Sequence, residues 1–240
     1  GFSPGFAYLA GAHPALHVPR LPEPRTAVPA GSVAVAAGMT AIYPQPTPGG
    51  WHLIGRSDLA MFDPAGVDPT LFRPGDRVRF RPVGDVGPPP PAAVAGDGPA
   101  PAPGRPYLQV LEAGPLTTIQ DLGRLGWAHL GVPRAGAADR SAAAAANRLV
   151  GNPPGSAVLE ATLAGPRLRA GAALTVAVTG ARADVRVDGL PARQDAPLRL
   201  SAGAELAVGP FRAGTRCYIA VTGGIAVAPL LGSRSADTLS

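Results

Sequence analysis

The order of apolar and polar residues predicts a mostly β chain that contains one clear helix. Short runs rich in β-branched and aromatic residues recur along the chain, and turn residues separate them. Before residue 84 such runs cover residues 32–37, 40–43, 51–55 and 77–81. After residue 106 they cover residues 108–112, 157–163, 173–179, 183–187, 198–201, 205–208 and 216–221. This spacing favours barrels or sandwiches built from short strands.

Residues 139–150 depart from this pattern and predict the helix. Asp139 suits the N-cap position, and the alanines that follow have the highest helix propensity. Gly151 and Pro153 end the helical pattern.

The run at residues 77–81 alternates apolar and charged positions. Val78 and Phe80 would point to one side of a strand, and Arg77, Arg79 and Arg81 to the other. We interpret the arginine side as a solvated face.

Residues 84–106 divide the chain into two parts. They consist mainly of Pro, Ala and Gly, and such a segment cannot bury enough apolar surface to form a core. We therefore expect a domain at residues 1–83, a semi-rigid linker at 84–106 and a second domain at 107–240. The chain begins without methionine and its last residues contain no closing element, so it is interpreted as an internal fragment of a longer protein.

Composition narrows the chemistry. All 21 basic residues are arginine, so the chain cannot supply a lysine that carries biotin, forms a Schiff base or binds phosphate in a Walker-type loop. The net charge of +5 is dispersed and aromatics make up only 5% of residues, so we expect no nucleic-acid surface. An anionic small substrate fits equally well, because guanidinium groups pair with carboxylates.

Cysteine and histidine positions offer no metal site. The single cysteine, Cys217, lies in an alternating stretch and is predicted to be a small core residue. His13 and His17 are four residues apart, but Pro14 and Pro19 argue against a helix that would bring them together. No run is long enough to span a membrane and no signal peptide is visible, so a cytoplasmic protein is expected.

Residues 114–140 hold the densest group of polar side chains, between five glycines. Gln120, Asp121 and Arg124 are compatible with an anion-binding and acid–base group, or with an Asp–Arg pair that only staples the loop. His129 and Arg134 are candidates for substrate binding.

Two carboxylates close to this segment are further catalytic candidates. Asp139 suits a helix cap as well as a catalytic role. Glu160 lies inside an apolar strand pattern, and a carboxylate in that position needs a partner or a raised pKa.

Residues 42–56 have a similar character and lie on the other side of the linker. Tyr43, Trp51 and Arg56 are candidates for substrate contact, and the aromatic residues are also compatible with simple hairpin packing. Because both segments combine irregular backbone with polar and aromatic groups, we expect two modules that build one site. The chain has no G-x-S-x-G elbow, H-E-x-x-H motif or lysine-bearing phosphate loop, so the residues alone do not name a reaction.

Long strings of residues resemble a known family. Residues 1–83, through GFSPGFAYLAG, AIYPQPTPGGWHLIGRSDLAMFDP and FRPGDRVRF, resemble the C-terminal part of allophanate hydrolase subunit 1, also called the B component of 5-oxoprolinase or KipI. Residues 108–240, through EAGPLTTIQDLGRLGWAHLGVPRAGAADR, LEATLAGPRL and GGIAVAPLLGSRSADTLS, resemble the start of allophanate hydrolase subunit 2, also called the C component of 5-oxoprolinase or KipA.

The resemblance implies cyclophilin-like β-barrel domains with few short helices, and two fused components whose active site is built across both halves. It implies part of an ATP-dependent 5-oxoprolinase, an amide hydrolase that opens 5-oxo-L-proline to L-glutamate with a separate A component. Parts of both components are missing from residues 1–240, so this fragment alone is expected to be inactive. A homo-oligomer is compatible with the sequence.

Two other functions stay open. The same pair of domains resembles the carboxyltransferase region of biotin-dependent urea carboxylase, which acts on urea or a related amide. Biotin would then be carried by another domain, because this chain has no lysine. The Kip names also suggest a non-catalytic regulator that binds a sensor histidine kinase.

Overall fold

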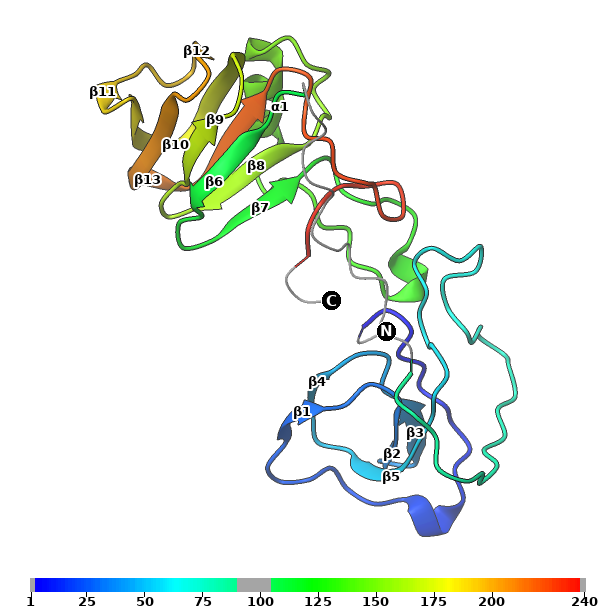
Figure 1. The fold of residues 1–240 in the computed structure, drawn as a ribbon. Helices are drawn as coiled ribbons and strands as arrows, with labels where there is room; N and C mark the ends of the chain where they lie inside the picture. Colours follow the sequence, from blue (N-terminus) through cyan, green and yellow to red (C-terminus); the bar gives the residue numbers. More distant parts are fainter. Residues whose placement is uncertain (1–2, 90–104, 238–240) are drawn as a thin grey trace. The chain divides into compact units, whose positions relative to one another are not determined.

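The computed structural model describes residues 3–89 and 105–237, which form two compact units (Figure 1). Among the described residues, unit 1 contains residues 3–89 and 126–133, and unit 2 contains residues 105–125 and 134–237. Most of the predicted linker, residues 90–104, lies outside the described residues. No helix among the described residues is long and apolar enough to cross a membrane.

Unit 1 is built from short antiparallel strands. In a three-stranded sheet, β2 (Ser32–Ala36) pairs with both β3 (Met39–Ile42) and β5 (His52–Arg56). A second pair consists of β1 (Arg25–Val28) and β4 (Thr47–Gly49), and a 3-10 turn covers η1 (Pro14–Leu16). The predicted strands at residues 32–37, 40–43 and 51–55 are thus confirmed to within one residue at each end.

An aromatic cluster forms the main core of unit 1. Phe6 meets Tyr43 and Trp51 edge to face, with ring centroids 5.1 and 6.0 Å apart. All three residues are buried, and alanines of β2 and β3 pack beside them. Because aromatic rings bury large areas, this small unit acquires a core despite its short strands.

The strand predicted at residues 77–81 is not formed. These residues follow an irregular path and pair with no strand among the described residues. Arg77, Arg79 and Arg81 are exposed, as predicted for a solvated face. The prediction of a strand was wrong because alternation concerns the side chains only. A strand also needs a neighbouring strand to pair with its backbone N–H and C=O groups.

Unit 2 contains an eight-stranded antiparallel sheet and one α-helix among its described residues. Five strands follow the path β11-β10-β13-β8-β7, and β6, β9 and β12 attach at the sides (Figure 1). The strands are β6 (Leu108–Glu112), β7 (Thr117–Gln120), β8 (Val158–Thr162), β9 (Arg167–Ala170), β10 (Leu174–Val187), β11 (Leu190–Pro191), β12 (Pro197–Leu200) and β13 (Glu205–Val221).

Two long strands, β10 and β13, bend the sheet. The ladder between them shifts register between Gly180 and Val185, which marks bulges in the middle of both strands. The first half of β13 pairs with β9 and the second half with β8. Each long strand therefore serves two sets of neighbours, and the sheet curls around an apolar interior.

Alternate residues of β13 face two different cores. Cys217 and Ile219 lie in the interior of the curled sheet, whereas Tyr218 and Ala220 face the helix α1 (Arg140–Leu149). Burial raises the pKa of the Cys217 thiol to about 12, in agreement with its predicted role as a core residue. Because successive side chains of a strand point to opposite faces of the sheet, β13 contributes residues to both cores.

The helix α1 has the predicted position and caps. The Asp139 carboxylate accepts from the Ala142 N–H at 2.9 Å, as an N-cap side chain does. Beyond the C-terminus, the Asn152 side chain donates to Asn147 Oδ1 at 3.0 Å and to the Val221 carbonyl at 2.7 Å. These bonds tie the end of the helix to β13.

Candidate functional site

In unit 2, residues 120–124 lie between two other pieces of backbone. On one side, the Arg124 N–H donates to the Arg134 carbonyl at 2.8 Å, and the Ala137 N–H donates to the Asp121 carbonyl at 2.9 Å. On the other side, the Ala236 N–H donates to the Ile119 carbonyl at 2.8 Å. The polar residues of this segment are thus placed at a junction of three chain segments.

The Asp121 carboxylate accepts four hydrogen bonds from the protein. Its Oδ1 accepts from the Gly123 N–H at 2.7 Å, from Ser233 Oγ at 2.6 Å and from Ser235 Oγ at 2.7 Å. Its Oδ2 accepts from the Arg234 N–H at 2.6 Å. Partial burial would raise the pKa of Asp121, but these four hydrogen bonds together lower it. The carboxylate is therefore held in its ionised form.

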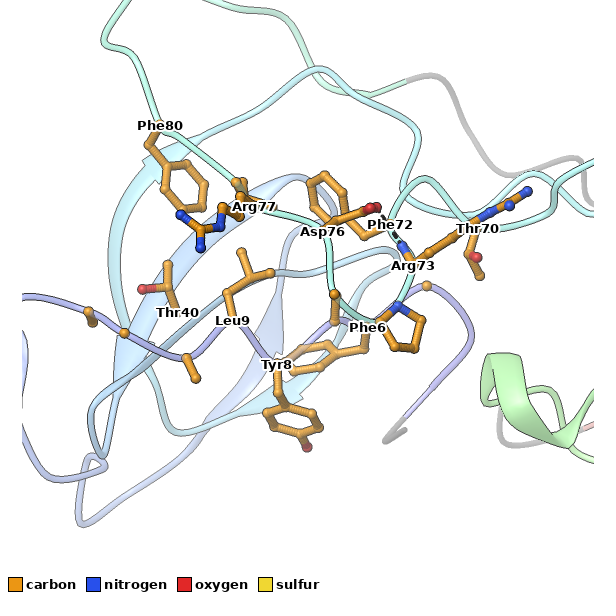
Figure 2. Close-up of a pocket in the computed structure, with 18 of the residues that line it drawn as sticks. Phe6, Tyr8, Leu9, Thr40, Thr70, Phe72, Arg73, Asp76, Arg77 and Phe80 are labelled. Carbon is orange, nitrogen blue, oxygen red and sulfur yellow. Dashed lines mark hydrogen bonds between the residues drawn. The ribbon is translucent and has the colours of Figure 1, made fainter.

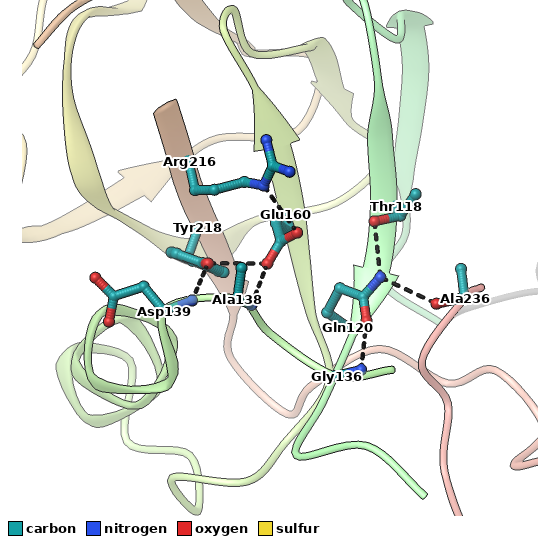
Figure 3. Close-up of polar contacts among 9 residues, drawn as sticks. All are labelled: Thr118, Gln120, Gly136, Ala138, Asp139, Glu160, Arg216, Tyr218 and Ala236. Atoms are coloured by element: carbon teal, nitrogen blue, oxygen red, sulfur yellow. Dashed lines mark hydrogen bonds and ion pairs between the residues drawn. The ribbon is translucent and has the colours of Figure 1, made fainter. Parts of the chain in front are cut away.

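Gln120 bridges the other two segments with its side-chain amide. Nε2 donates to the Ala236 carbonyl at 3.2 Å and to Thr118 Oγ1 at 3.0 Å, and Oε1 accepts from the Gly136 N–H at 3.1 Å (Figure 3). Gln120 is only 7% exposed. Both ends of the amide are thus engaged inside the protein.

Arg124 is also turned inward. Its side chain is buried, its Nη2 donates to the Ser235 carbonyl, and its buried Nε has no hydrogen-bond partner among the described residues. Arg124 and Asp121 contact the same short segment of chain, and they form no ion pair with each other. The predicted Asp–Arg staple therefore takes a different form, in which both side chains bind residues 233–235.

Two glycines allow this close approach. Gly123 and Gly136 have φ angles of +83° and +90°, which favour glycine. A Cβ on Gly136 would lie 2.8 Å from the Gly123 nitrogen, and one on Gly123 would lie 2.5 Å from the Arg134 oxygen. A side chain at either position would push the two backbones apart.

Four consecutive backbone amides, those of residues 136–139, each have a different acceptor. The Gly136 N–H donates to Gln120 and the Ala137 N–H to the Asp121 carbonyl. The Ala138 N–H donates to Glu160 Oε2 at 2.8 Å, and the Asp139 N–H donates to Tyr218 Oη at 2.7 Å (Figure 3). The chain that leads into α1 is thus fixed residue by residue.

Glu160 and Tyr218 form the deepest part of this network. They face each other on paired strands β8 and β13, and Tyr218 Oη donates to Glu160 Oε2 at 2.8 Å. Arg216 Nε lies 3.3 Å from Glu160 Oε1 and forms an ion pair with it. Burial, together with the hydrogen bond to Glu160 and its charge, raises the pKa of the Tyr218 phenol, which therefore stays protonated and donates. The partner that Glu160 was expected to need is present.

The two remaining candidates of this segment are placed differently. The Asp139 side chain caps α1, as described above, and Arg134 is exposed, with its carbonyl bonded to the Arg124 N–H. His129 belongs to the part of the segment that clusters with unit 1, in the turn η2 (Ala128–Leu130). It is exposed, and its Nδ1 lies 3.0 Å from the Gly126 carbonyl oxygen.

The candidates of residues 42–56 lie in unit 1. Tyr43 and Trp51 are 2% and 4% exposed and belong to the aromatic core, and burial raises the pKa of Tyr43. Arg56, the last residue of β5, is exposed. The structure therefore presents one of these three side chains to solvent. That these residues share one site with residues 114–140 stays a prediction.

Unit 1 also contains an open groove with a volume of about 980 Å³. Figure 2 shows its walls, which are formed mainly by Gly5–Ala12 on one side and by residues 72–80 on the other. Phe72 and Phe80 contribute apolar surface, and Arg77 contributes a charge. Of the predicted site residues, His129 alone is among its lining residues.

Sequence reasoning missed three residues that organise the site, namely Tyr218, Ser233 and Ser235. Tyr218 was visible only as one member of an alternating strand, and the serines only as part of a polar end region. Ser233 and Ser235 are 1% and 3% exposed. Their partners lie more than 110 residues away in the sequence, so no local pattern could have connected them. The described residues contain no cluster of His, Cys, Asp or Glu suited to a metal ion.

Comparisons with known proteins identify both parts of the chain. Residues 1–72 match the family model "Carboxyltransferase domain, subdomain C and D", and residues 130–240 match "Carboxyltransferase domain, subdomain A and B". Over 82 residues, the chain is 56% identical to the B component of 5-oxoprolinase from Escherichia coli O157:H7, a match that covers 34% of this chain and 38% of the relative.

Other relatives match a longer stretch at lower identity. The chain is 38% identical over 130 residues to the C component of 5-oxoprolinase from Escherichia coli K12, which covers 54% of this chain and 42% of the relative. It is 37% identical over 133 residues to urea amidolyase of Lachancea kluyveri, which covers 55% of this chain and 7% of the relative. The chain therefore spans less than half the length of these curated relatives.

Solved structures agree with this assignment. The crystal structure of TTHA0988 covers the whole chain with a TM-score of 0.88 and 43% identity, and the chain covers 48% of it. The crystal structure of the K. lactis urea amidolyase covers 53% of the chain with a TM-score of 0.52 and 38% identity, and the chain covers 8% of it. Residues 1–72 and 130–240 therefore belong to the carboxyltransferase-domain family, and the chain joins a C/D region to an A/B region in one polypeptide.

Proposed function

We propose that the chain is part of an ATP-dependent 5-oxoprolinase, which opens 5-oxo-L-proline to L-glutamate together with a separate A component. The observation that carries this proposal is the 56% identity to a protein named as the B component of 5-oxoprolinase. The B components of Bacillus subtilis and Haemophilus influenzae are 50% and 51% identical over 80 residues. A relative named as the C component, at 38% identity, supports the presence of the second component in the same chain.

The alternative is the carboxyltransferase component of a biotin-dependent urea carboxylase. The longer matches do not separate the two, because the identities to the C component of 5-oxoprolinase and to urea amidolyase are 38% and 37%. The shorter matches favour 5-oxoprolinase, since they reach 50–56% identity to proteins of that name. Under the alternative, biotin would be attached to another domain, because the chain has no lysine.

The reaction defines what the side chains must do. The ring amide of 5-oxoproline is stable, and ATP supplies the phosphoryl group that makes its carbonyl carbon electrophilic. Donors must then stabilise the charge on the carbonyl oxygen, and a carboxylate must orient the attacking water. The chain has no lysine-bearing phosphate loop, so we assign nucleotide binding to no residue here.

The contacts support some candidates more than others for direct contact with substrate. Gln120, Asp121 and Arg124 are engaged by other parts of unit 2. Arg56 and Arg134 are both exposed, and either guanidinium suits the carboxylate of 5-oxoproline. We propose these two arginines as the substrate-binding residues to be tested first.

The decisive experiment uses the full-length protein with the A component of 5-oxoprolinase. We expect ADP and glutamate to form only when 5-oxoproline is supplied. Arg134→Ala should raise the KM for 5-oxoproline at least about tenfold, which corresponds to loss of about 1.4 kcal/mol of binding. Arg199→Ala, on β12 of the same unit, is the control and should leave the KM unchanged.

The alternative predicts a different result in the same preparation. If no ADP forms with 5-oxoproline, but urea is carboxylated when carboxybiotin is supplied, the urea carboxylase function is correct. A protein that supports neither reaction but binds a sensor histidine kinase would instead be a regulator.

A further inference from the structure

Residues 120–124 and 233–236 are joined by an unusually complete set of hydrogen bonds. Besides the bonds that the Asp121 carboxylate accepts, the Asp121 N–H donates to Ser235 Oγ at 2.9 Å. The Ser235 N–H donates to Ser233 Oγ at 3.0 Å. Each serine hydroxyl therefore both donates and accepts, and we call Asp121, Ser233 and Ser235 the serine clamp.

The clamp leaves Asp121 little capacity for proton transfer. A carboxylate that accepts four hydrogen bonds from the protein has few lone pairs left for water or substrate. The two serines whose hydroxyls donate to it are almost completely buried, so the charge is stabilised from inside the protein. These contacts suit a group that holds the backbone in place.

We propose that Asp121, Ser233 and Ser235 are positioning residues that fix the chain at residues 134–139 through Gln120 and Gly123. The proposal rests on the proposed function, because it concerns the same segment, and it assigns a role to two serines outside the predicted site. Under this proposal Asp121 is not an acid–base catalyst. It positions the backbone of residues 134–139 through the residues next to it.

A continuous path of contacts supports this role. The clamp fixes residues 121 and 123, the Asp121 carbonyl accepts from the Ala137 N–H, and the Gly123 backbone packs directly against Gly136. Gln120, next to the clamp, holds the Gly136 N–H. The clamp therefore fixes the backbone between Arg134 and Asp139 indirectly, through these contacts of residues 120–123.

Hydrogen–deuterium exchange of the full-length protein tests the positioning directly. Asp121→Asn and the double variant Ser233→Ala/Ser235→Ala should raise amide exchange at residues 134–139 by about tenfold or more, as well as at residues 233–236. The control is Asp188→Asn, which also removes one negative charge. Asp188 accepts from the Glu205 N–H at 2.8 Å in a turn of the same unit, outside the clamp. It should leave exchange at residues 134–139 unchanged.

Turnover with the A component of 5-oxoprolinase then separates positioning from stability. Positioning predicts that kcat per folded molecule falls at least about tenfold in both clamp variants, while the KM for ATP does not change. Combining Asp121→Asn with the serine substitutions should add little, because all three changes break the same contacts. The Asp188→Asn protein should retain its kcat.

Three results would overturn the proposal. Exchange that rises only at residues 233–236 would show that the clamp does not order residues 134–139. Raised exchange at 134–139 with normal kcat would show that this order is unimportant for the reaction. Additive losses of kcat would show that Asp121 acts independently of the serines. If the wild-type protein does not turn over 5-oxoproline, the proposed function fails, and urea carboxylation with carboxybiotin then supplies the kinetic readout for the clamp variants.

Discussion

Residues 114–140 and residues 42–56 both combine glycines with polar and aromatic residues. Different interactions stabilise the two segments in the structure. In unit 2, polar side chains and backbone amides bind one another around Asp121, Gln120 and Glu160. In unit 1, Tyr43 and Trp51 pack into an apolar core, and Arg56 is left at the surface. One segment is stabilised by directed hydrogen bonds and the other by aromatic burial.

This difference shows that a polar loop is not by itself a set of free functional groups. Backbone amides in irregular chain need acceptors, and in unit 2 several of the side chains that look catalytic provide them. The comparison predicts that substitutions in unit 1 act through packing and that substitutions in unit 2 act through the position of the backbone.

The largest effect is expected from Trp51→Ala in unit 1. Removing a buried aromatic side chain costs about 3–5 kcal/mol, because it leaves a cavity and loses two ring contacts. Urea unfolding of the full-length protein, followed by amide exchange at residues 32–56, measures this loss. Phe80→Ala is the control, since Phe80 is 46% exposed, and it should cost little. Normal stability combined with lost substrate binding would show that Trp51 faces the substrate.

A smaller effect is expected from Gly136→Ala in unit 2. The new Cβ would meet backbone atoms and the residue would keep a positive φ, so we expect a loss of about 3 kcal/mol. Gly189→Ala has a positive φ of +77° but meets nothing within 4 Å, and it should cost about 1 kcal/mol. Equal losses in thermal unfolding of the two variants would mean that crowding against Gly123 is unimportant.

Tyr218→Phe tests the network beneath the helix. It leaves the Asp139 N–H without its acceptor and removes one of the donors to Glu160, which should cost about 2 kcal/mol. The matched control is Tyr107→Phe, because Tyr107 is 44% exposed, and its stability should equal that of the wild type. Chemical denaturation measures both, and a Tyr218→Phe protein as stable as the wild type would contradict the role we give to this hydroxyl.

The smallest effect is a change in the pH dependence of stability. Because the pKa of Asp121 is lowered in the folded protein, its stabilising contribution is present above its ordinary value of 3.8 and is lost as the pH falls through the lowered value. Asp121→Asn should therefore flatten the acid side of the stability curve and reduce stability at neutral pH. Unfolding midpoints measured from neutral pH to below about pH 4 check this. A parallel shift at every pH would rule out titration of Asp121 as the cause.

Much of the secondary structure could be predicted from local sequence. The helix that follows Asp139 has its cap, its alanines and its terminator within about a dozen residues, and its bounds were predicted correctly. The strands at residues 108–112 and 157–163 were also confirmed. The strand β7 was missed, because Thr117–Gln120 lies in a segment whose glycines and polar residues indicate a loop.

The arrangement of the site could not be predicted, because it depends on pairing between distant strands. The sequence indicated that Glu160 needs a partner but did not identify Tyr218, which lies 58 positions further along. The register of β8 against β13 brings the two together, and register depends on the whole sheet. The contacts of Ser233 and Ser235 with Asp121 could not be predicted for the same reason, because the residues lie more than 110 positions apart in the sequence.

The distance along the chain between the two halves of the clamp also has a consequence for synthesis. Residues 120–124 leave the ribosome long before residues 233–236, which follow after more than 100 further residues. Until then Asp121 lacks most of its hydrogen-bond donors, and closing so long a loop is slow. During translation, residues 120–124 are therefore synthesised before they can become ordered. In that interval they are accessible to chaperones and proteases.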